Sequence, residues 1–163
     1  MRGWTVMQPK NIATFECEVI QKEFKLIGQS ITVNFPDSFP DAAIKLQKDF
    51  FNRVDEVHNT KSKEVLFSPY MCNEIIATYF ACLEVDEIDK IPEGMIGFKL
   101  PMTKYAKISC SNKTISEGYD AVFAWMKEHG YKQRWFDHSS PVEIYYIDEN
   151  ALEETAEILI PIY

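Results

Sequence analysis

The sequence lacks the features that mark several large classes of protein. No apolar run approaches the roughly 20 residues of a membrane span, and the first residues contain no long apolar stretch of the kind that a secretory signal needs. Only 6 of the 163 residues are glycine and 8 are proline, while 46% are hydrophobic, which excludes disordered, collagen-like and coiled-coil chains. We therefore expect one globular domain, residues 1–163, in the cytoplasm.

Short motifs for metal, nucleotide and disulfide chemistry are also missing. The four cysteines include no C-x-x-C pair, and the three histidines show no H-x-x-x-H or H-E-x-x-H spacing, so neither a disulfide framework nor a zinc site is expected. The chain contains no glycine-rich nucleotide-binding loop and no G-x-S-x-G. We therefore expect no metal and no cofactor.

Basic residues are few. The chain has 17 of them against 25 acidic residues, a formal net charge of -8, and no Lys/Arg cluster of the length that DNA-binding arms use. Such a chain repels a phosphate backbone, so direct DNA binding is not expected. The balance favours a small-molecule or protein partner, including a cationic one, although an acidic surface also serves solubility alone.

Hydrophobic periodicity predicts the same order of elements twice. In the first half it predicts extended chain at 12–19 and 24–35 with an interruption at Gly28, a five-turn helix from Asp37–Pro40 to Val57, and strands at 64–70 and 75–85. In the second half it predicts an extended segment at 96–110 broken at Pro101, a helix from the capping box Thr114–Glu117 to Gly130, and strands at 142–147 and 156–163.

This repeat indicates the fold class. We expect an α+β domain of two βαββ units with pseudo-twofold symmetry, the first at about 10–86 and the second at about 94–163, joined by the charged connector 86–94. Their strands would form one antiparallel sheet with both helices on one face. The groove between two such helices is a common place for a ligand.

Glu143 is the first candidate functional residue. It lies in the otherwise apolar strand Pro-Val-Glu-Ile-Tyr-Tyr-Ile, and alternation places it on the same face as Tyr145 and Ile147. A carboxylate buried there is costly unless it pairs with a cationic ligand or acts as an acid or base. The pattern equally allows an outward glutamate on a solvated face.

Aromatic residues are the second set of candidates. They would line a pocket and stack on a flat or cationic ligand, although plain core packing is the simpler explanation for any one of them. Those selected with Tyr145 are Tyr79, Tyr105, Trp125 and Trp135. Trp125 lies off the apolar stripe of its helix and is expected to face the groove, and 132–136 is expected to form a loop over the pocket.

Several short segments follow one another in an order that is typical of a known family. They are Tyr79–Val85, Ile91–Met95, Leu100–Pro101, Lys104–Ile108, Ala124–Met126, Gly130–Tyr131, Pro141–Tyr145 and Ile160–Ile162. In this order the chain resembles the GyrI-like family, the effector-binding domains of many AraC-type and multidrug-responsive regulators, together with their stand-alone and integron-associated relatives. The resemblance covers essentially the whole chain.

The resemblance implies an SHS2-type duplication of two βαββ units and a hydrophobic groove for drug-like, often cationic molecules. Glu143 matches the pocket glutamate of the family, and Trp125 matches a family tryptophan on the second helix. Family regulators carry a helix-turn-helix ahead of this domain, whereas here the domain begins within about a dozen residues of Met1. We therefore expect a stand-alone binding protein without direct DNA contact.

Two alternatives follow from the same resemblance. Some stand-alone members are hydrolases of strained, cyclopropane-bearing toxins that use the groove glutamate, in which case Glu143 would be a general base. Others resemble gyrase inhibitors, which implies a protein partner such as gyrase or a regulator. The binding role is the first expectation of the three. Haem-binding relatives also exist, but no suitable axial ligand is evident.

Overall fold

Two successive units of strand, helix and two strands make up the computed structural model, which describes residues 15–135 and 137–163. The first unit contains β2 (Cys17–Asn34), α1 (Asp41–Phe51), the short 3₁₀ helix η2 (Val54–Glu56), β3 (Val65–Cys72) and β4 (Ile76–Glu84). The second contains β5 (Ile96–Ser111), α2 (Ile115–His129), β6 (Val142–Tyr146) and β7 (Thr155–Pro161). The predicted βαββ repeat is therefore present. Its expected first residues, 10–14, lie outside the described part of the chain.

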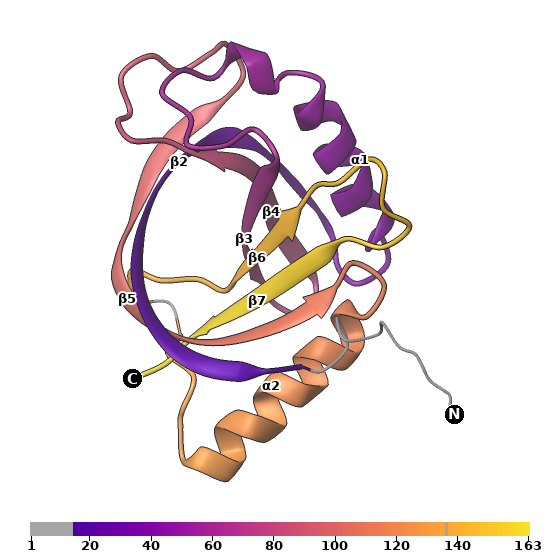
Figure 1. Cartoon of the computed structure of the whole chain (residues 1–163), viewed down its shortest axis with the longest axis vertical. Coiled ribbons are helices and arrows are strands. Elements are labelled where there is room, and N and C mark those ends of the chain that lie inside the picture. The colour runs from indigo at the N-terminus through magenta and orange to yellow at the C-terminus, as the bar shows by residue number, and fades with distance from the viewer. Residues whose placement is uncertain (1–14, 136) are drawn as a thin grey trace.

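The six strands form one antiparallel sheet that closes into a barrel. The strand order is β2-β4-β3-β6-β7-β5, and β2 pairs with β5 to complete the ring, as the two long arcs in Figure 1 show. The first unit contributes its first, third and second strands in that order (β2-β4-β3), and the second unit contributes its second, third and first strands (β6-β7-β5). The second order is the reverse of the first, as a pseudo-twofold relation requires. The predicted α+β class with a single antiparallel sheet is confirmed. Closure also pairs both edges of the sheet.

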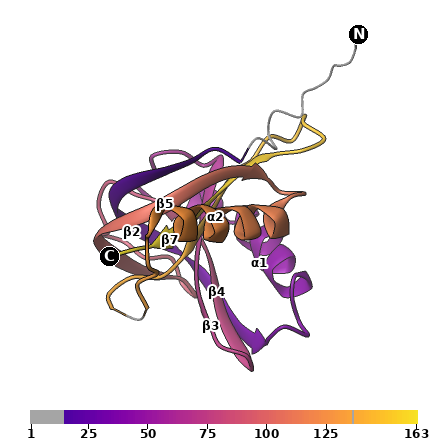
Figure 2. The same cartoon turned by 90° about the horizontal axis from the view of Figure 1, so that it is seen from below.

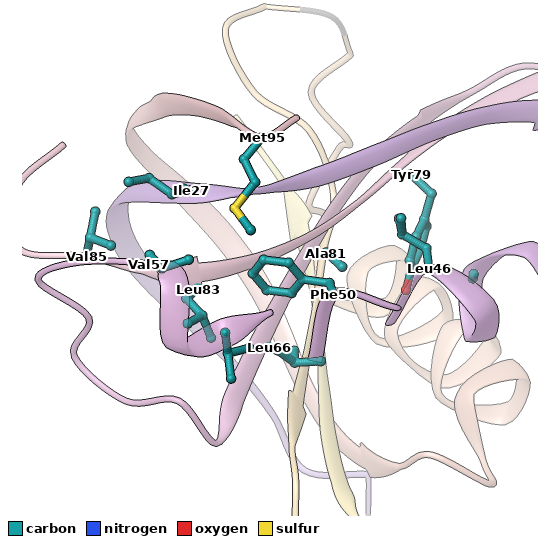
Figure 3. Close-up of a cluster of buried hydrophobic side chains, with 12 residues drawn as sticks. Ile27, Leu46, Phe50, Val57, Leu66, Tyr79, Ala81, Leu83, Val85 and Met95 are labelled. Carbon is teal, nitrogen blue, oxygen red and sulfur yellow. The ribbon is translucent and has the colours of Figure 1, made fainter. Parts of the chain in front are cut away.

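Side chains alternate between the inside and the outside of the barrel. On β4, Phe80 belongs to a buried cluster that contains strand residues only and fills the inside, whereas Ala81 packs outward against Phe50 of α1 (Figure 3). On β7, Ile158 packs outward in the cluster that contains Val122 of α2. Both helices therefore cover the outer face of one sheet, as predicted. In the view from below of Figure 2, α2 lies nearer the viewer than α1.

Strand β2 is continuous, whereas the sequence predicted a break at Gly28. The irregularity in its pairing with β5 falls between Lys22 and Phe24, next to Pro101 of the partner strand. Proline donates no backbone hydrogen bond, so an interrupted ladder is its usual place. Gly28 lies opposite Cys82 and is required because β4 approaches there: an added Cβ would lie 2.0 Å from the Ala81 carbonyl oxygen.

The helix predicted to run to Val57 ends at Phe51. Beyond it, Arg53 N–H bonds to the Phe50 carbonyl and the chain tightens into the 3₁₀ turn of η2. Val54 and Val57 are still buried, so their spacing marked burial rather than a continuous helix. Helix α1 begins at Asp41, directly after the predicted start at Asp37–Pro40, and no side-chain hydrogen bond caps it.

Helix α2 follows the prediction at its C-terminus and departs from it at the start. Gly130 ends it in the left-handed conformation with φ 78°, as expected. The predicted capping box does not form, because the Thr114 hydroxyl accepts a hydrogen bond from the Ser111 N–H instead of one from the helix. No helix within the described residues has both the length and the apolar character that crossing a bilayer would require.

Candidate ligand-binding site

A cleft of about 1230 Å³ opens between α1 and α2 over the outer face of the sheet. Phe39 lines it just before α1, Ala43 and Gln47 line it from α1, and Tyr119 lines it from α2. Its apolar wall on the sheet side consists of Leu66, Ala77, Tyr79, Tyr145 and Ile147. Both βαββ units contribute to the cleft, so it exists only because the two units share one sheet.

Glu143 lies at the base of this cleft and is only 8% exposed. Three tyrosines donate hydrogen bonds to its carboxylate. Tyr79 and Tyr145 donate to Oε1 at 2.9 and 2.7 Å, and Tyr119 donates to Oε2 at 2.6 Å. The three donors come from β4, β6 and α2, so tertiary structure alone gathers them around the carboxylate.

Strand alternation and register explain this arrangement. Glu143 and Tyr145 are two residues apart on β6 and share its outer face. Glu143 pairs with Ser68 of β3, and Tyr70, two residues further on the same face of β3, pairs with Tyr79 of β4. The Tyr79 hydroxyl also accepts a hydrogen bond from Nε2 of Gln47 at 3.1 Å, which links α1 to the same network.

The environment of the tyrosines favours the protonated form, in which a phenol donates a hydrogen bond. Burial raises the pKa of Tyr79, Tyr119 and Tyr145 well above the ordinary tyrosine value, and the negative charge of Glu143 raises it further. The pKa of Tyr70 is raised for the same two reasons. Phenolic hydroxyls that retain their protons at neutral pH stabilise an ionised carboxylate beside them.

No positive charge of the described residues compensates Glu143. The ion pairs of that part of the chain involve other carboxylates, and Glu143 has only phenolic partners. The surroundings are acidic as well. Two lysines of the cleft lining, Lys48 and Lys113, are outnumbered by the carboxylates Glu117, Asp120, Glu149 and Glu154. The cleft therefore combines a negative field with a largely apolar wall.

Aromatic rings border the carboxylate on two sides. The Phe39 ring meets the Tyr79 ring edge to face, with centroids 5.8 Å apart. The rings of Tyr70 and Tyr119 meet in the same way at 6.4 Å, and Tyr119 stacks on Phe123. Rings fixed in this manner present both faces and edges to an apolar ligand.

The structure brings together half of the residues selected from the sequence. Glu143, Tyr145 and Tyr79 meet at the base of the cleft. Tyr105 does not line it: β5 alternation turns this residue into the barrel, where it is fully buried against Phe24, and burial raises its pKa to about 12.

The two tryptophans also lie outside the cleft lining. Trp125 does not face the groove as predicted, because its ring stacks with the rings of His129 and Tyr131 near the C-terminus of α2. Trp135 is 58% exposed, and no described residue of the segment 132–140 lines the cleft. The expectation that 132–136 covers the pocket is thus wrong for the four residues that the structure describes; position 136 lies outside them.

Sequence reasoning missed Tyr119, Phe39 and Gln47. Tyr119 and Phe39 lie on the apolar stripes of their predicted helices, where an aromatic residue is most simply explained as core. The Tyr119 hydroxyl and the Phe39 ring reach the site only because the helices flank one cleft. The one available signal was the polar tip of Tyr119 on an otherwise apolar stripe, since a buried phenol needs a partner.

A family model for integron-associated effector-binding proteins, Cass2, matches residues 10–162. The chain belongs to the Cass2 family. This confirms the resemblance to GyrI-like effector-binding domains that the order of short segments indicated. No curated protein sequence is similar to the chain.

Solved structures support the same fold for this Cass2 member. SAV2435 bound to tetraphenylphosphonium has a TM-score of 0.71 and 12% identity, covering 91% of this chain and 94% of that one. An integron cassette protein from the mobile metagenome of Vibrio cholerae has a TM-score of 0.62 and 12% identity, with 90% and 95% covered. The EcmrR C-terminal domain has a TM-score of 0.60 and 13% identity, with 92% and 98% covered. At such identities the likeness shows the shared fold alone.

Proposed function

We propose that this protein binds hydrophobic, cationic small molecules in the cleft, with Glu143 neutralising the charge of the ligand. The observation that carries the proposal is a buried carboxylate that has three phenolic donors and no positive partner among the described residues. Three donors satisfy its hydrogen-bonding needs, but they do not neutralise its charge.

The physical argument concerns the cost of burial. An ionised carboxylate loses much of its hydration when it is removed from water, and an opposite charge in the same low-dielectric surroundings recovers part of that loss. The aromatic rings of Phe39, Tyr70 and Tyr79 offer apolar contact and cation-π attraction to the rest of such a ligand. A cleft of about 1230 Å³ accommodates several aromatic rings at once.

The comparisons support this choice of ligand class. SAV2435, which shares the fold, was solved with tetraphenylphosphonium, a permanently charged and strongly apolar cation. EcmrR, whose C-terminal domain shares the fold, was solved in complex with DNA. We infer for the present chain a cytoplasmic role as a sensor or sequestering protein for such cations.

The geometry favours charge recognition over the alternative of hydrolysis. Of about four lone-pair positions on a carboxylate, the hydrogen bonds from Tyr79, Tyr119 and Tyr145 occupy three. A general base must have an accessible lone pair directed at water, so this carboxylate is better suited to bind a cation than to take up a proton. Product formed beyond one equivalent per protein from a cyclopropane-bearing electrophile would reverse this preference.

Isothermal titration calorimetry with tetraphenylphosphonium tests the proposal. We expect saturable binding by the full chain and a loss of about tenfold or more in affinity for Glu143→Gln, which removes the charge and keeps the shape. Glu128→Gln is the matched control, because it removes one exposed carboxylate from the far end of α2. Neutral triphenylphosphine oxide should bind more weakly and respond little to Glu143→Gln. Equal affinities of the parent and Glu143→Gln for the cation would refute the proposal.

A further inference from the structure

The carboxylate of Glu143 has little hydrogen-bonding capacity left for a ligand. Tyr79 and Tyr145 donate to Oε1 at 2.9 and 2.7 Å, and Tyr119 donates to Oε2 at 2.6 Å. A carboxylate offers about four lone-pair positions, so about one position remains once these three bonds are made. We call the three phenolic side chains of Tyr79, Tyr119 and Tyr145 the tyrosine cluster.

Other acceptors are also scarce beside the tyrosine cluster. The Tyr79 hydroxyl already accepts a hydrogen bond from Nε2 of Gln47 at 3.1 Å. The side chains of Phe39, Leu66 and Ala77, which line the same cleft, are apolar and accept none. A ligand that reaches Glu143 therefore meets a negative charge in surroundings that offer few new hydrogen bonds.

The remaining carboxylates of the cleft lining do not supply this missing capacity. Glu117, Asp120 and Glu149 are exposed, so they stay hydrated, and an ion pair with any of them contributes little to affinity. Oε2 of Glu154 already accepts a hydrogen bond from the Asp148 N–H at 3.0 Å. These groups attract every cation to the cleft without distinguishing one kind from another.

Two cations of equal charge make different demands on such a site. A primary ammonium group is strongly hydrated and has three N–H donors, of which Glu143 can accept about one. The other donors lose their water without gaining a full replacement, which costs binding free energy. A quaternary ammonium or phosphonium centre has no N–H group, so it needs only the negative charge and the faces of aromatic rings.

The tyrosine cluster removes lone pairs from the ligand but does not remove the charge. Burial and the charge of Glu143 raise the pKa of all three phenols, so they remain neutral donors. The rings of Phe39 and Tyr70 also border the site, in edge-to-face contact with Tyr79 and Tyr119. A charge without free lone pairs, among aromatic rings, suits a cation that makes no hydrogen bonds.

We propose that the tyrosine cluster makes the cleft select cations without N–H groups over primary ammonium ions of similar size and equal charge. This inference rests on the proposed function and narrows its ligand class to quaternary onium ions and similar donor-free cations. Tyr119 is the specificity-determining residue that is easiest to isolate, because it is the one member of the cluster that donates to Oε2.

Isothermal titration calorimetry of the full chain with two matched cations tests this inference. 3,3-Diphenylpropylammonium has three N–H groups, whereas its N,N,N-trimethyl derivative has none and keeps both rings and the charge. At pH 7, where both are fully charged, we expect the trimethyl derivative to bind about tenfold more tightly. Equal or tighter binding of the primary ammonium would overturn this inference and leave the proposed function intact, whereas binding of neither cation would overturn both.

The variant Tyr119→Phe separates this selectivity from the extra apolar surface of three methyl groups. It frees a lone-pair position on Oε2, so the preference for the trimethyl derivative should fall about fivefold, the worth of one hydrogen bond. A purely structural effect would change both affinities by the same factor. Tyr145→Phe, which frees a position on Oε1, should shift the preference in the same direction.

Tyr131→Phe is the matched control, because Tyr131 lies just beyond α2 and does not line the cleft. It should leave the preference unchanged, and circular dichroism verifies the fold of all three variants. The same preference in the parent, Tyr119→Phe and Tyr145→Phe would show that apolar contact alone selects the ligand, and it would overturn the inference.

Discussion

The Tyr119 hydroxyl lies 2.6 Å from Oε2 of Glu143 and connects α2 to the centre of the sheet. Through this hydrogen bond the second helix reaches the carboxylate at the base of the candidate site. The other two donors to Glu143, Tyr79 and Tyr145, belong to strands, and they form the remaining side of the same network.

Replacing Tyr119 by Phe should lower stability without abolishing ligand binding. The substitution deletes one hydrogen bond to a buried carboxylate, so the free energy of unfolding should fall by about 1–3 kcal/mol in urea denaturation. Affinity for tetraphenylphosphonium should be equal or higher, because the charge of Glu143 is then less compensated. Tyr131→Phe, at the other end of α2, is the control. Loss of cation binding in Tyr119→Phe with an intact fold would contradict this account of the site.

The protein should lose stability at alkaline pH through its buried tyrosines. The pKa values of Tyr79, Tyr119 and Tyr145 are raised above the unfolded value of about 10. The folded protein therefore holds protons that the unfolded chain releases, and this stabilisation is complete below about pH 10 and decreases as the pH rises further toward the folded-state values. Urea denaturation from pH 8 to pH 11 measures the decrease. Tyr145→Phe should show a shallower decrease than the parent, and identical slopes would argue against the assignment.

Gly28→Ala should be one of the most destabilising small substitutions in the chain. The new Cβ would lie 2.0 Å from the Ala81 carbonyl oxygen and 2.6 Å from Cys82 Cα, so β2 and β4 must separate there. We expect a loss of about 3 kcal/mol or more. Gly130→Ala is the comparison, since Gly130 has open space and only its positive φ opposes a side chain, at a cost of about 1 kcal/mol. Equal losses of stability in the two variants would show that β4 can move away from β2 at little cost in free energy.

Substitutions at the two tryptophans should leave cation binding nearly unchanged. Trp125→Phe alters the stack with His129 and Tyr131, and Trp135→Ala alters an exposed side chain, but neither residue lines the cleft. We expect affinities for tetraphenylphosphonium within about twofold of the parent, as for sites that are distant and independent. Circular dichroism verifies the fold of both variants. A large loss of affinity in either would place the ligand elsewhere than in the cleft.

The sequence by itself determined the repeat and singled out Glu143 as a candidate. Periodicity of two and of about 3.6 residues located the strands and helices of both units, because burial of one face imposes those periods. Glu143 was identifiable because a lone carboxylate in an apolar strand is costly, and Tyr145 followed from strand alternation alone. Gly130 marked the end of α2 for an equally local reason, its positive φ.

Tertiary structure decided what each pattern left open. Alternation assigned Tyr105 to one face of β5, but only the pairing of β2 with β5 made that face the inside of a barrel. Tyr119 and Tyr79 reach Glu143 from 24 and 64 residues away in sequence, distances over which no local period applies. Pairing partners between strands are chosen by the packing of the whole sheet rather than by neighbours in sequence. The acid and its strand neighbour Tyr145 were therefore predictable, whereas the hydrogen bonds from Tyr79 and Tyr119 to the acid were not.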